Sequence, residues 1–187
     1  MTAVLDRELA QSDRDACREI LARGSKSFAL ASRALPERLR DPVAAFYAFC
    51  RVSDDLVDDS ADPRGALAAL RVRVDRAERG TPDDDPVDRA LAFVMRAHGL
   101  PRVAVDALLD GYLWDVEQRS YPTLSDTIAY SARVASSVGV AMTVLMGVRD
   151  RATLARARSH ALRALPVNAL PLTLSYPRSR ITRPMSP

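Results

Sequence analysis

Four aspartates cluster in residues 51–59, which read RVSDDLVDD, and their spacing suggests metal chemistry. At about 100° per residue, a helix would place Tyr47, Arg51, Asp54 and Asp58 within an arc of about 60°. Carboxylates at this spacing repel one another, and the C-terminal end of a helix disfavours anions. The pattern therefore predicts a compensating cation. Mg²⁺ is the natural candidate, because it takes oxygen ligands and shares its shell with substrate phosphates.

Arg51 lies one turn before the aspartates, where a guanidinium group could bind a phosphate through two hydrogen bonds. The alternative interpretation is a solvated acidic helix end without a ligand. The tyrosine, arginine and two aspartates on one stripe, among the apolar residues Phe46, Phe49 and Val57, favour a site.

The elements that must position this cluster are predicted to be helical, because no run of alternating β-branched residues indicates a strand. Asp41 as N-cap and Pro42 in the first turn predict that the helix bearing the cluster spans 41–59. Trp114, Phe93 and Cys50 are expected in the core. Further helices are expected over 14–23, 25–32, 62–78, 87–97, 101–119 and 124–146.

The charge of the chain is unevenly distributed. Residues 1–150 carry all 24 acidic and 20 of the 27 basic residues, whereas residues 151–187 carry seven arginines and no acid. The net charge of +3 therefore arises from the end of the chain and does not indicate nucleic-acid binding. Five of the twelve prolines fall in 159–187. We expect a partial helical domain over 1–158 and an aberrant, disordered tail rich in proline and arginine over 159–187.

The remaining composition indicates a soluble protein. No apolar run approaches the roughly 20 residues of a membrane helix, and the N-terminus lacks the apolar core of a signal peptide. Two cysteines cannot form a disulfide framework, so a reduced cytoplasmic setting is expected.

Several motifs occur in an order and spacing typical of one family. They are GSKSF at 24–28, LP at 35–36, AFYAFCR at 45–51, DDLVD at 54–58, Gly111-Tyr112 with Asp115, and YSARVASSVG at 130–139. Across residues 13–150 the chain resembles the N-terminal half of the phytoene/squalene synthase family. The resemblance implies an all-α isoprenoid (terpenoid) synthase helical fold.

The resemblance also implies a prenyltransferase that joins two prenyl diphosphates head to head. For the phytoene synthase type, two geranylgeranyl diphosphates give phytoene via prephytoene diphosphate, releasing diphosphate, in carotenoid biosynthesis. A squalene or hydroxysqualene synthase acting on farnesyl diphosphate is the alternative, because the cavity length that separates these substrates is not visible in the sequence.

The resemblance assigns roles to individual residues. Asp54 and Asp58 would hold Mg²⁺, with Mn²⁺ as an alternative, and Asp55 would support them. Residues contacting diphosphate or the reacting centre would be Ser25, Ser27, Tyr47 and Arg51. Phe28 would shield the carbocation, and the prenyl cavity would be lined by Tyr130, Val134 and Val138. From the sequence alone, Ser25 and Ser27 could equally be helix caps. The small residues around Tyr130, Val134 and Val138 could instead allow a neighbouring helix to pack closely.

The family's second aspartate-rich motif has no counterpart here, because no acid follows Asp150. We therefore expect a missing or frameshifted C-terminal part after about residue 158. The chain alone would be weakly active or inactive, and the helix 124–146 would expose an apolar face. An inactive helical remnant and a non-enzymatic acidic helical module are the other hypotheses. The expected partner is a prenyl diphosphate, not nucleic acid, and the lipidic substrate leaves peripheral membrane contact open.

Overall fold

The computed structural model describes residues 9–148 and residue 150, and every regular element in these residues is helical. The all-α prediction is confirmed for this part of the chain, whereas the predicted tail, 159–187, lies outside the described residues. The elements are α1 (Gln11–Gly24), α2 (Lys26–Ser32), α3 (Glu37–Asp58), α4 (Pro63–Arg79), α5 (Pro86–Ala97), α6 (Arg102–Val116), α7 (Leu124–Ser131), the π-helical turn η1 (Ala132–Ser136) and α8 (Ser137–Leu145).

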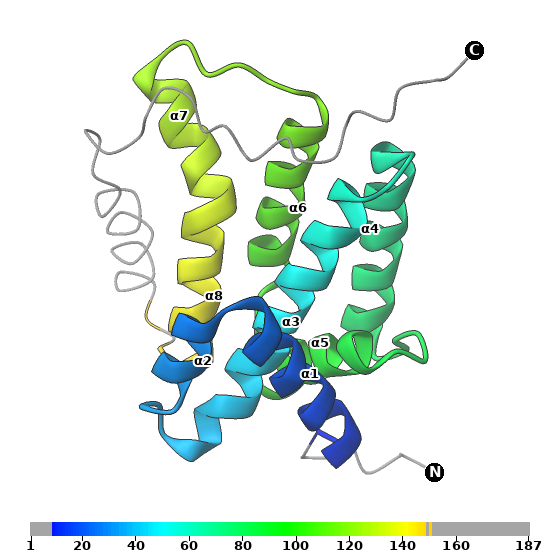
Figure 1. The fold of residues 1–187 in the computed structure, drawn as a ribbon, viewed down its shortest axis with the longest axis vertical. Helices are drawn as coiled ribbons and strands as arrows, with labels where there is room; N and C mark the ends of the chain where they lie inside the picture. Colours follow the sequence, from blue (N-terminus) through cyan, green and yellow to red (C-terminus); the bar gives the residue numbers. More distant parts are fainter. Residues whose placement is uncertain (1–8, 149, 151–187) are drawn as a thin grey trace.

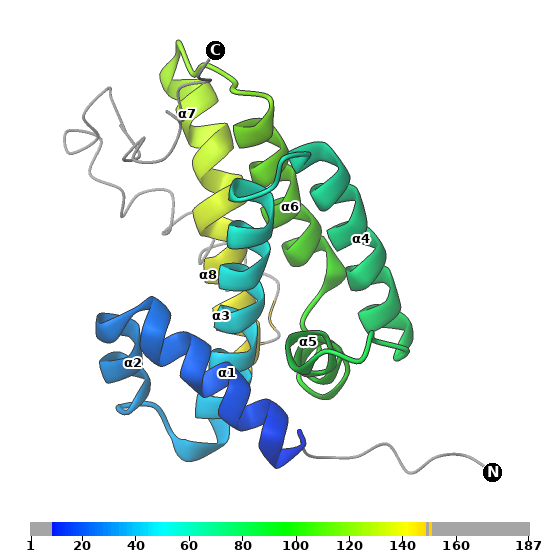
Figure 2. The same ribbon diagram turned by 45° about the vertical axis from the view of Figure 1, so that its right-hand side comes forward.

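The long helix α3 is the centre of the arrangement, since it contacts α1, α4, α5, α6 and α8. Helices α3, α4, α6 and the continuous α7–η1–α8 run side by side (Figure 1). Helix α5 crosses their base and is seen nearly along its axis in Figure 2, where α1 packs against both α3 and α5. The acidic end of α3 therefore lies at the opposite end of the bundle from α5.

The core is apolar and contributed by most of the helices. Phe46 and Phe49 of α3 are almost completely buried. The other large, fully buried apolar side chains are Leu70, Val74, Leu91, Val94, Val105, Leu109 and Leu145. Burial of apolar surface on this scale is the main force holding α3 in place.

Two adjacent residues of α5 clamp it to its neighbours through buried carboxylate–guanidinium pairs. Asp88 of α5 accepts hydrogen bonds from Arg73 of α4 at 2.8 and 3.0 Å. Arg89 of α5 donates to the buried Asp13 of α1 at 2.7 and 2.9 Å. Each carboxylate is almost fully buried. Removing one partner of either pair would therefore leave an unpaired charge between the helices and destabilise their packing.

The predicted start of the helix bearing the cluster is wrong. Helix α3 begins at Glu37, directly after Pro36, and Pro42 lies inside it. Asp41 does not cap the helix; its carboxylate pairs with Arg18 of α1 at 2.6 Å. A pairing between helices therefore explains this aspartate better than the local capping pattern does.

The long helix predicted over 124–146 is observed as α7, η1 and α8. Thr123 and Asp126 form a capping box at its start, with each side chain accepting from the other's backbone N–H. Three apolar side chains on or just after it are exposed, as expected: Leu124, Ile128 and Met146.

The expectation that no segment could span a membrane needs correction. Within the described residues, Leu124–Leu145 is long and apolar enough to do so by length and composition, and 33% of its most apolar stretch is buried. This is weak evidence for a membrane helix, because core helices of soluble proteins pass the same test.

Candidate functional site

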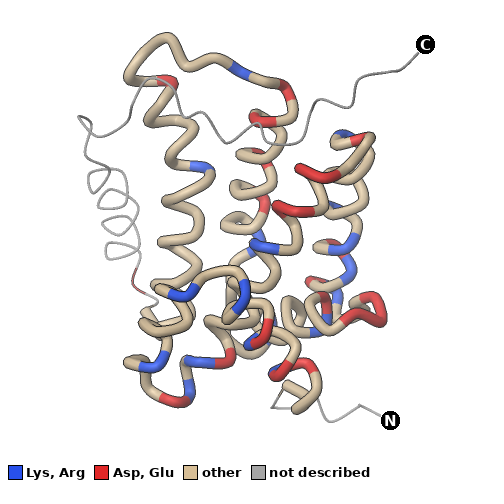
Figure 3. The backbone as a smooth tube through the Cα atoms, in the orientation of Figure 1, with Lys and Arg blue, Asp and Glu red and all other residues tan. Residues whose placement is uncertain are grey.

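The predicted chemical stripe lies on the last four turns of α3. Arg51 and Asp58 are exposed, whereas Tyr47 and Asp54 are half-buried. The opposite side of the same turns is buried in the core through Phe46, Phe49, Ser53 and Val57. Acidic residues therefore gather at the C-terminal end of α3, and others lie on the upper turns of α6 (Figure 3). The amphipathic pattern of α3 positions the stripe, because burying the aromatic side turns the carboxylates outward.

Arg51 is engaged by the acids of its own helix. Its Nη2 atom lies 2.6 Å from Oδ1 of Asp55, and its Nη1 atom lies 3.9 Å from Oδ2 of Asp54. The side chains of the two ion pairs are between about one third and one half exposed. Arg51 thus partly neutralises the cluster, and Asp55 points along the helix toward the arginine.

The carboxylates are electrostatically unfavourable in the absence of a cation. Partial burial and the neighbouring charge of Asp58 raise the pKa of Asp54 from 3.8 to about 6, and Arg51 only partly opposes this shift. The pKa of Asp58 is also raised, chiefly by loss of solvent and then by Asp55. A cation near Asp54 and Asp58 would relieve this repulsion.

A third carboxylate, on another helix, belongs to the same electrostatic group. Asp115 of α6 raises the pKa of Asp54, and its own pKa is raised by loss of solvent and by Asp58. Oδ2 of Asp115 accepts a hydrogen bond of 3.0 Å from the phenol of Tyr130 on α7. Asp115 belongs to the motif that contains Gly111 and Tyr112, but its role depends on α7 and could not be assigned from that motif.

The carboxylates do not form a closed metal cage. Within residues 9–148 and 150, no group of three or more His, Cys, Asp and Glu side chains could hold a metal ion. Mg²⁺ bound beside a substrate phosphate, however, uses only one or two protein carboxylates. Asp54 and Asp58 supply such a donor set, and the pKa of each is raised by loss of solvent and by neighbouring carboxylates.

The predicted diphosphate residues Ser25 and Ser27 lie at the start of α2. Oγ of Ser25 accepts from the backbone N–H of Phe28 at 3.2 Å, so Ser25 caps the helix. The two serine Oγ atoms lie 3.2 Å apart. Both serines retain some exposure, which leaves the hydroxyl of Ser27 accessible.

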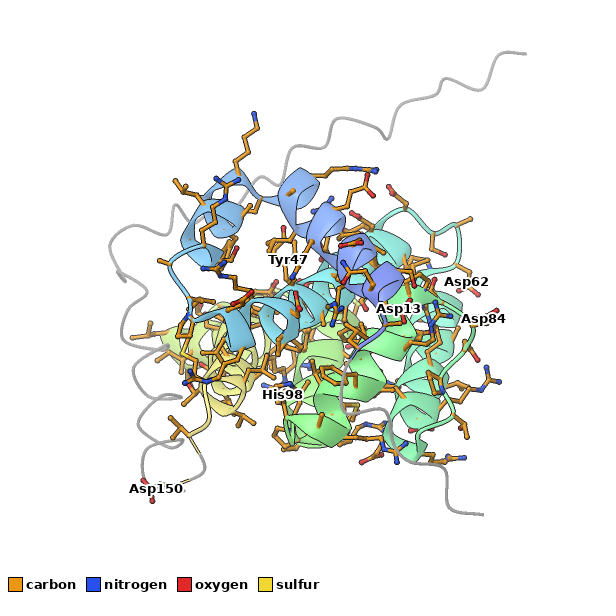
Figure 4. The ribbon with its side chains drawn as sticks, turned by 90° about the horizontal axis from the view of Figure 1, so that it is seen from below. Asp13, Tyr47, Asp62, Asp84, His98 and Asp150 are labelled. Atoms are coloured by element: carbon orange, nitrogen blue, oxygen red, sulfur yellow. The ribbon has the colours of Figure 1, made fainter. Side chains whose placement is uncertain are left out.

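Tyr47 connects α2 to the stripe. Its ring lies 5.9 Å from the ring of Phe28, and Figure 4 shows Tyr47 pointing from α3 toward α1 and α2. A Cβ atom on Gly24 would lie 2.6 Å from the Tyr47 hydroxyl, so glycine is needed for this close approach. Phe28 itself is 58% exposed, and in the described residues it forms no closed shield for a carbocation.

The predicted cavity residues Tyr130, Val134 and Val138 share the α7–η1–α8 helix. Val134 packs on α6, where a Cβ atom on Gly111 would lie 2.5 Å from its Cγ1 atom. Val138 is partly buried against the core. The structure thus brings Tyr130 to the carboxylates through Asp115 and uses Val134 for close helix packing.

A shallow hollow of about 520 Å³ opens beside the cluster, between the end of α3 and the start of α4. It is lined by Val52, Asp55, Leu56, Asp59, Ser60 and Ala66. None of the three predicted cavity residues lines it, so this hollow is not the expected prenyl cavity.

The other expectations concerned the core. Cys50 has its thiol pKa raised to about 12 by burial, which excludes a reactive thiolate at neutral pH and agrees with a packing role. Trp114, expected in the core, is only half-buried and lies at the end of α6 beside Tyr121. Phe93 is likewise half-buried and contacts the ring of His98 at 5.3 Å.

An all-helical bundle that carries a carboxylate stripe on its central helix defines the class of the protein. Two solved structures share the helical fold of this chain. A dehydrosqualene synthase in complex with a ligand matches with a TM-score of 0.74 and 32% identity, covering 81% of this chain and 53% of the other. A squalene synthase from Alicyclobacillus acidocaldarius matches with a TM-score of 0.75 and 28% identity, covering 81% and 57%. The fold is the isoprenoid synthase helical fold.

Sequence comparison then gives the family. The squalene/phytoene synthase family model matches residues 21–166, and the chain belongs to that family. A phytoene synthase of Rhodobacter capsulatus is 51% identical over 152 residues, and one of Cereibacter sphaeroides is 48% identical over 159 residues. Each alignment covers 80% of this chain and 45% of the relative, so the chain spans about half the length of these relatives.

Proposed function

We propose that this chain carries the metal- and diphosphate-binding stripe of a phytoene synthase-type prenyltransferase. The observation that supports the proposal most strongly is the stripe of α3, on which the half-buried Asp54 lies with Tyr47, Arg51 and Asp58. Partial burial and the charge of Asp58 raise the pKa of Asp54 to about 6, and the chain is 51% identical to a phytoene synthase. The alternative, a solvated acidic helix end without a ligand, does not account for the partial burial of Asp54 beside other carboxylates.

In this proposal Asp54 and Asp58 hold Mg²⁺, or Mn²⁺, with Asp55 in support. The bound cation would neutralise the diphosphate leaving group as a Lewis acid. Arg51 adds a second positive charge at the same end of α3. Arg51 already pairs with Asp55 at 2.6 Å, and the other N–H donors of its guanidinium can bind a phosphate.

The remaining residues orient the substrate. Ser27 and the hydroxyl of Tyr47 lie toward the α2 end of the stripe and can donate hydrogen bonds to phosphate oxygens. At the other end, Tyr130 holds Asp115 beside the metal-binding pair. The substrate would therefore lie along α3, with its diphosphate near Arg51 and its prenyl chain directed along the apolar helix that carries Val138.

The reaction we propose is the head-to-head condensation of two geranylgeranyl diphosphates to phytoene via prephytoene diphosphate, with release of diphosphate. The alternative substrate is farnesyl diphosphate, because both phytoene synthases and squalene-forming enzymes resemble this chain. A prenyl substrate also fits a cytoplasmic protein with peripheral membrane contact, which we include in the proposal.

Binding and turnover are tested separately, because the chain spans about half the length of its relatives. The purified 187-residue chain is incubated with geranylgeranyl or farnesyl diphosphate, with and without Mg²⁺, and extracted products are identified by mass spectrometry. We expect Mg²⁺-dependent retention of the prenyl diphosphate, with weak or no product. Retention of the prenyl diphosphate that does not depend on Mg²⁺ would contradict the metal site. A C30 product would show that the substrate is farnesyl diphosphate, not geranylgeranyl diphosphate.

A further inference from the structure

The turn between α6 and α7 is closed by three aromatic side chains, which we call the aromatic row: Trp114, Tyr121 and Tyr130. The rings of Trp114 and Tyr121 are stacked with centroids 6.0 Å apart and planes inclined by 24°. The rings of Tyr121 and Tyr130 are stacked at 4.7 Å and 30°. Tyr121 is a loop residue, so stacking from both sides is what fixes its position between the two helices.

The outer end of the row is anchored by charge. The guanidinium carbon of Arg133 lies 3.9 Å from the ring centroid of Trp114, and that of Arg119 lies 4.6 Å from it. Both distances are within the range of cation–π attraction. Arg133 is itself held, since it donates a hydrogen bond of 2.8 Å to the carbonyl oxygen of Ala129. Trp114 is therefore restrained although it is only half-buried.

The inner end of the row reaches the carboxylates. Tyr130, stacked on Tyr121, donates its 3.0 Å hydrogen bond to Asp115, the acid of α6 that interacts with Asp54 and Asp58. A tilt of the Tyr130 ring would move its hydroxyl away from this carboxylate. Stacking limits that tilt, because neighbouring rings allow only a narrow range of angles.

We propose that Trp114 and Tyr121 are positioning residues, which hold Tyr130 and Asp115 in register with the aspartate stripe of α3. The inference rests on the proposed function, since it gives that stripe a support outside the residues that would touch metal or substrate. Groups that orient a ligand without touching the metal commonly change metal affinity by about 10-fold or more when removed.

Within the described residues, the hydroxyl of Tyr121 is buried and has no hydrogen-bond partner. The proposal therefore assigns the function of Tyr121 to its ring alone. This gives a matched pair of variants: Tyr121→Phe keeps the ring, and Tyr121→Ala removes it. A role of the hydroxyl would show in both variants, and a role of the ring only in the second.

The test uses the full chain labelled with 3-fluorotyrosine, whose five tyrosines give five ¹⁹F resonances that single Tyr→Phe variants assign. We expect the Tyr130 resonance to be unchanged in Tyr121→Phe. In Tyr121→Ala it should move toward the position of a solvated tyrosine. The Tyr47 resonance is the internal control for an intact fold, because Tyr47 contacts Phe28 at the other end of the stripe. Trp114→Leu is measured beside Tyr121→Ala with the same expectation, because this variant leaves the Tyr121 ring next to Tyr130 and therefore removes no neighbouring ring current.

The second measurement is the affinity for inorganic diphosphate in the presence of Mg²⁺, followed by calorimetry. We expect a loss of about 10-fold in Tyr121→Ala and none in Tyr121→Phe. An unmoved Tyr130 resonance in Trp114→Leu, or a moved resonance in Tyr121→Ala with unchanged affinity, would overturn the proposal. If the unmodified chain binds no diphosphate, the proposed function fails, and the Tyr130 resonance still decides whether the aromatic row positions this residue.

Discussion

Tyr130 of α7 and Asp115 of α6 are joined by a hydrogen bond of 3.0 Å from the phenol to the carboxylate. This bond lowers the pKa of Asp115, whereas loss of solvent and the charge of Asp58 raise it, so that the net shift is upward. The phenol thus stabilises a carboxylate that its surroundings would otherwise protonate more readily. The pair also links the helix before the aromatic turn to the helix after it.

Removing the phenol should therefore raise the pKa of Asp115 further. We expect Tyr130→Phe to shift the carboxyl titration of Asp115 to higher pH, measured by ¹³C NMR. The control is Tyr112→Phe, because the Tyr112 hydroxyl donates to the carbonyl oxygen of Cys50 and not to a carboxylate. Equal titrations of Asp115 in the unmodified chain and Tyr130→Phe would show that the hydrogen bond is absent in solution.

The carboxylate of Asp54 should make the fold less stable as the pH rises. Its pKa is raised from 3.8 to about 6, so between these values the folded chain binds a proton that the unfolded chain has lost. The free energy of unfolding therefore decreases as the pH rises through this interval and stays lower above it. We expect Asp54→Asn to raise stability near neutral pH by on the order of 1 kcal/mol, a value reduced for solvent screening.

Urea unfolding at two pH values, below and above this interval, measures the effect. Glu37→Gln is the control, because it removes one exposed charge from the other end of α3. If the free energy of unfolding of Asp54→Asn changes with pH as it does in the unmodified chain, the raised pKa does not belong to Asp54.

Removing one partner of the buried pair between Arg73 of α4 and Asp88 of α5 should lower the free energy of unfolding strongly. Asp88→Ala leaves the guanidinium of Arg73 without its buried acceptor, and we expect a loss of roughly 3 kcal/mol in the free energy of unfolding. Glu19→Ala breaks an exposed pair with Arg23 on α1 and should cost less than about 0.5 kcal/mol. Urea unfolding measures both losses. Similar losses in the two variants would show that burial does not make the Arg73–Asp88 pair more important for stability than the exposed pair.

The contact between α6 and the π-helical turn should show coupling between Gly111 and Val134. An added Cβ atom at residue 111 would lie 2.5 Å from Cγ1 of Val134, so Gly111→Ala should cost about 1–3 kcal/mol. Val134→Ala removes the atom that collides. In a double-mutant cycle we expect the double variant to lose less free energy of unfolding than the two single variants together, by at least about 0.5 kcal/mol. Additive losses would place the strain of Gly111→Ala elsewhere.

Much of this fold could be predicted from periodicity and caps. The helices expected over 62–78 and 87–97 agree with α4 and α5 to within one residue, and Asp62 and Asp85 cap them. Thr123 begins the long helix that ends at Leu145. The start of α3 could not be predicted in the same way. Asp41 followed by Pro42 has the local pattern of a helix start, but Arg18 of α1 binds this aspartate and the helix continues through it. Contacts between distant segments do not appear in a local pattern.

The candidate site was predicted in part for the same reason. The stripe of α3 follows from helical spacing, because all its members lie on one element. Asp115 and Trp114 could not be assigned, since their roles depend on a turn that brings α6 against α7. Helical apolar spacing predicts burial for Trp114, whereas two arginines and a tyrosine hold it at the edge of the bundle. The local sequence pattern thus predicts the helices better than the tertiary contacts between them.

In the proposed function, Asp54 and Asp58 bind a metal–diphosphate group at the end of α3. The most direct test is calorimetric titration of geranylgeranyl diphosphate into the unmodified chain and into the double variant Asp54→Asn/Asp58→Asn, each with and without Mg²⁺. We predict binding by the unmodified chain only when Mg²⁺ is present, and none by the double variant. Equal binding by the two chains, or binding by the unmodified chain that does not depend on Mg²⁺, would contradict the claim.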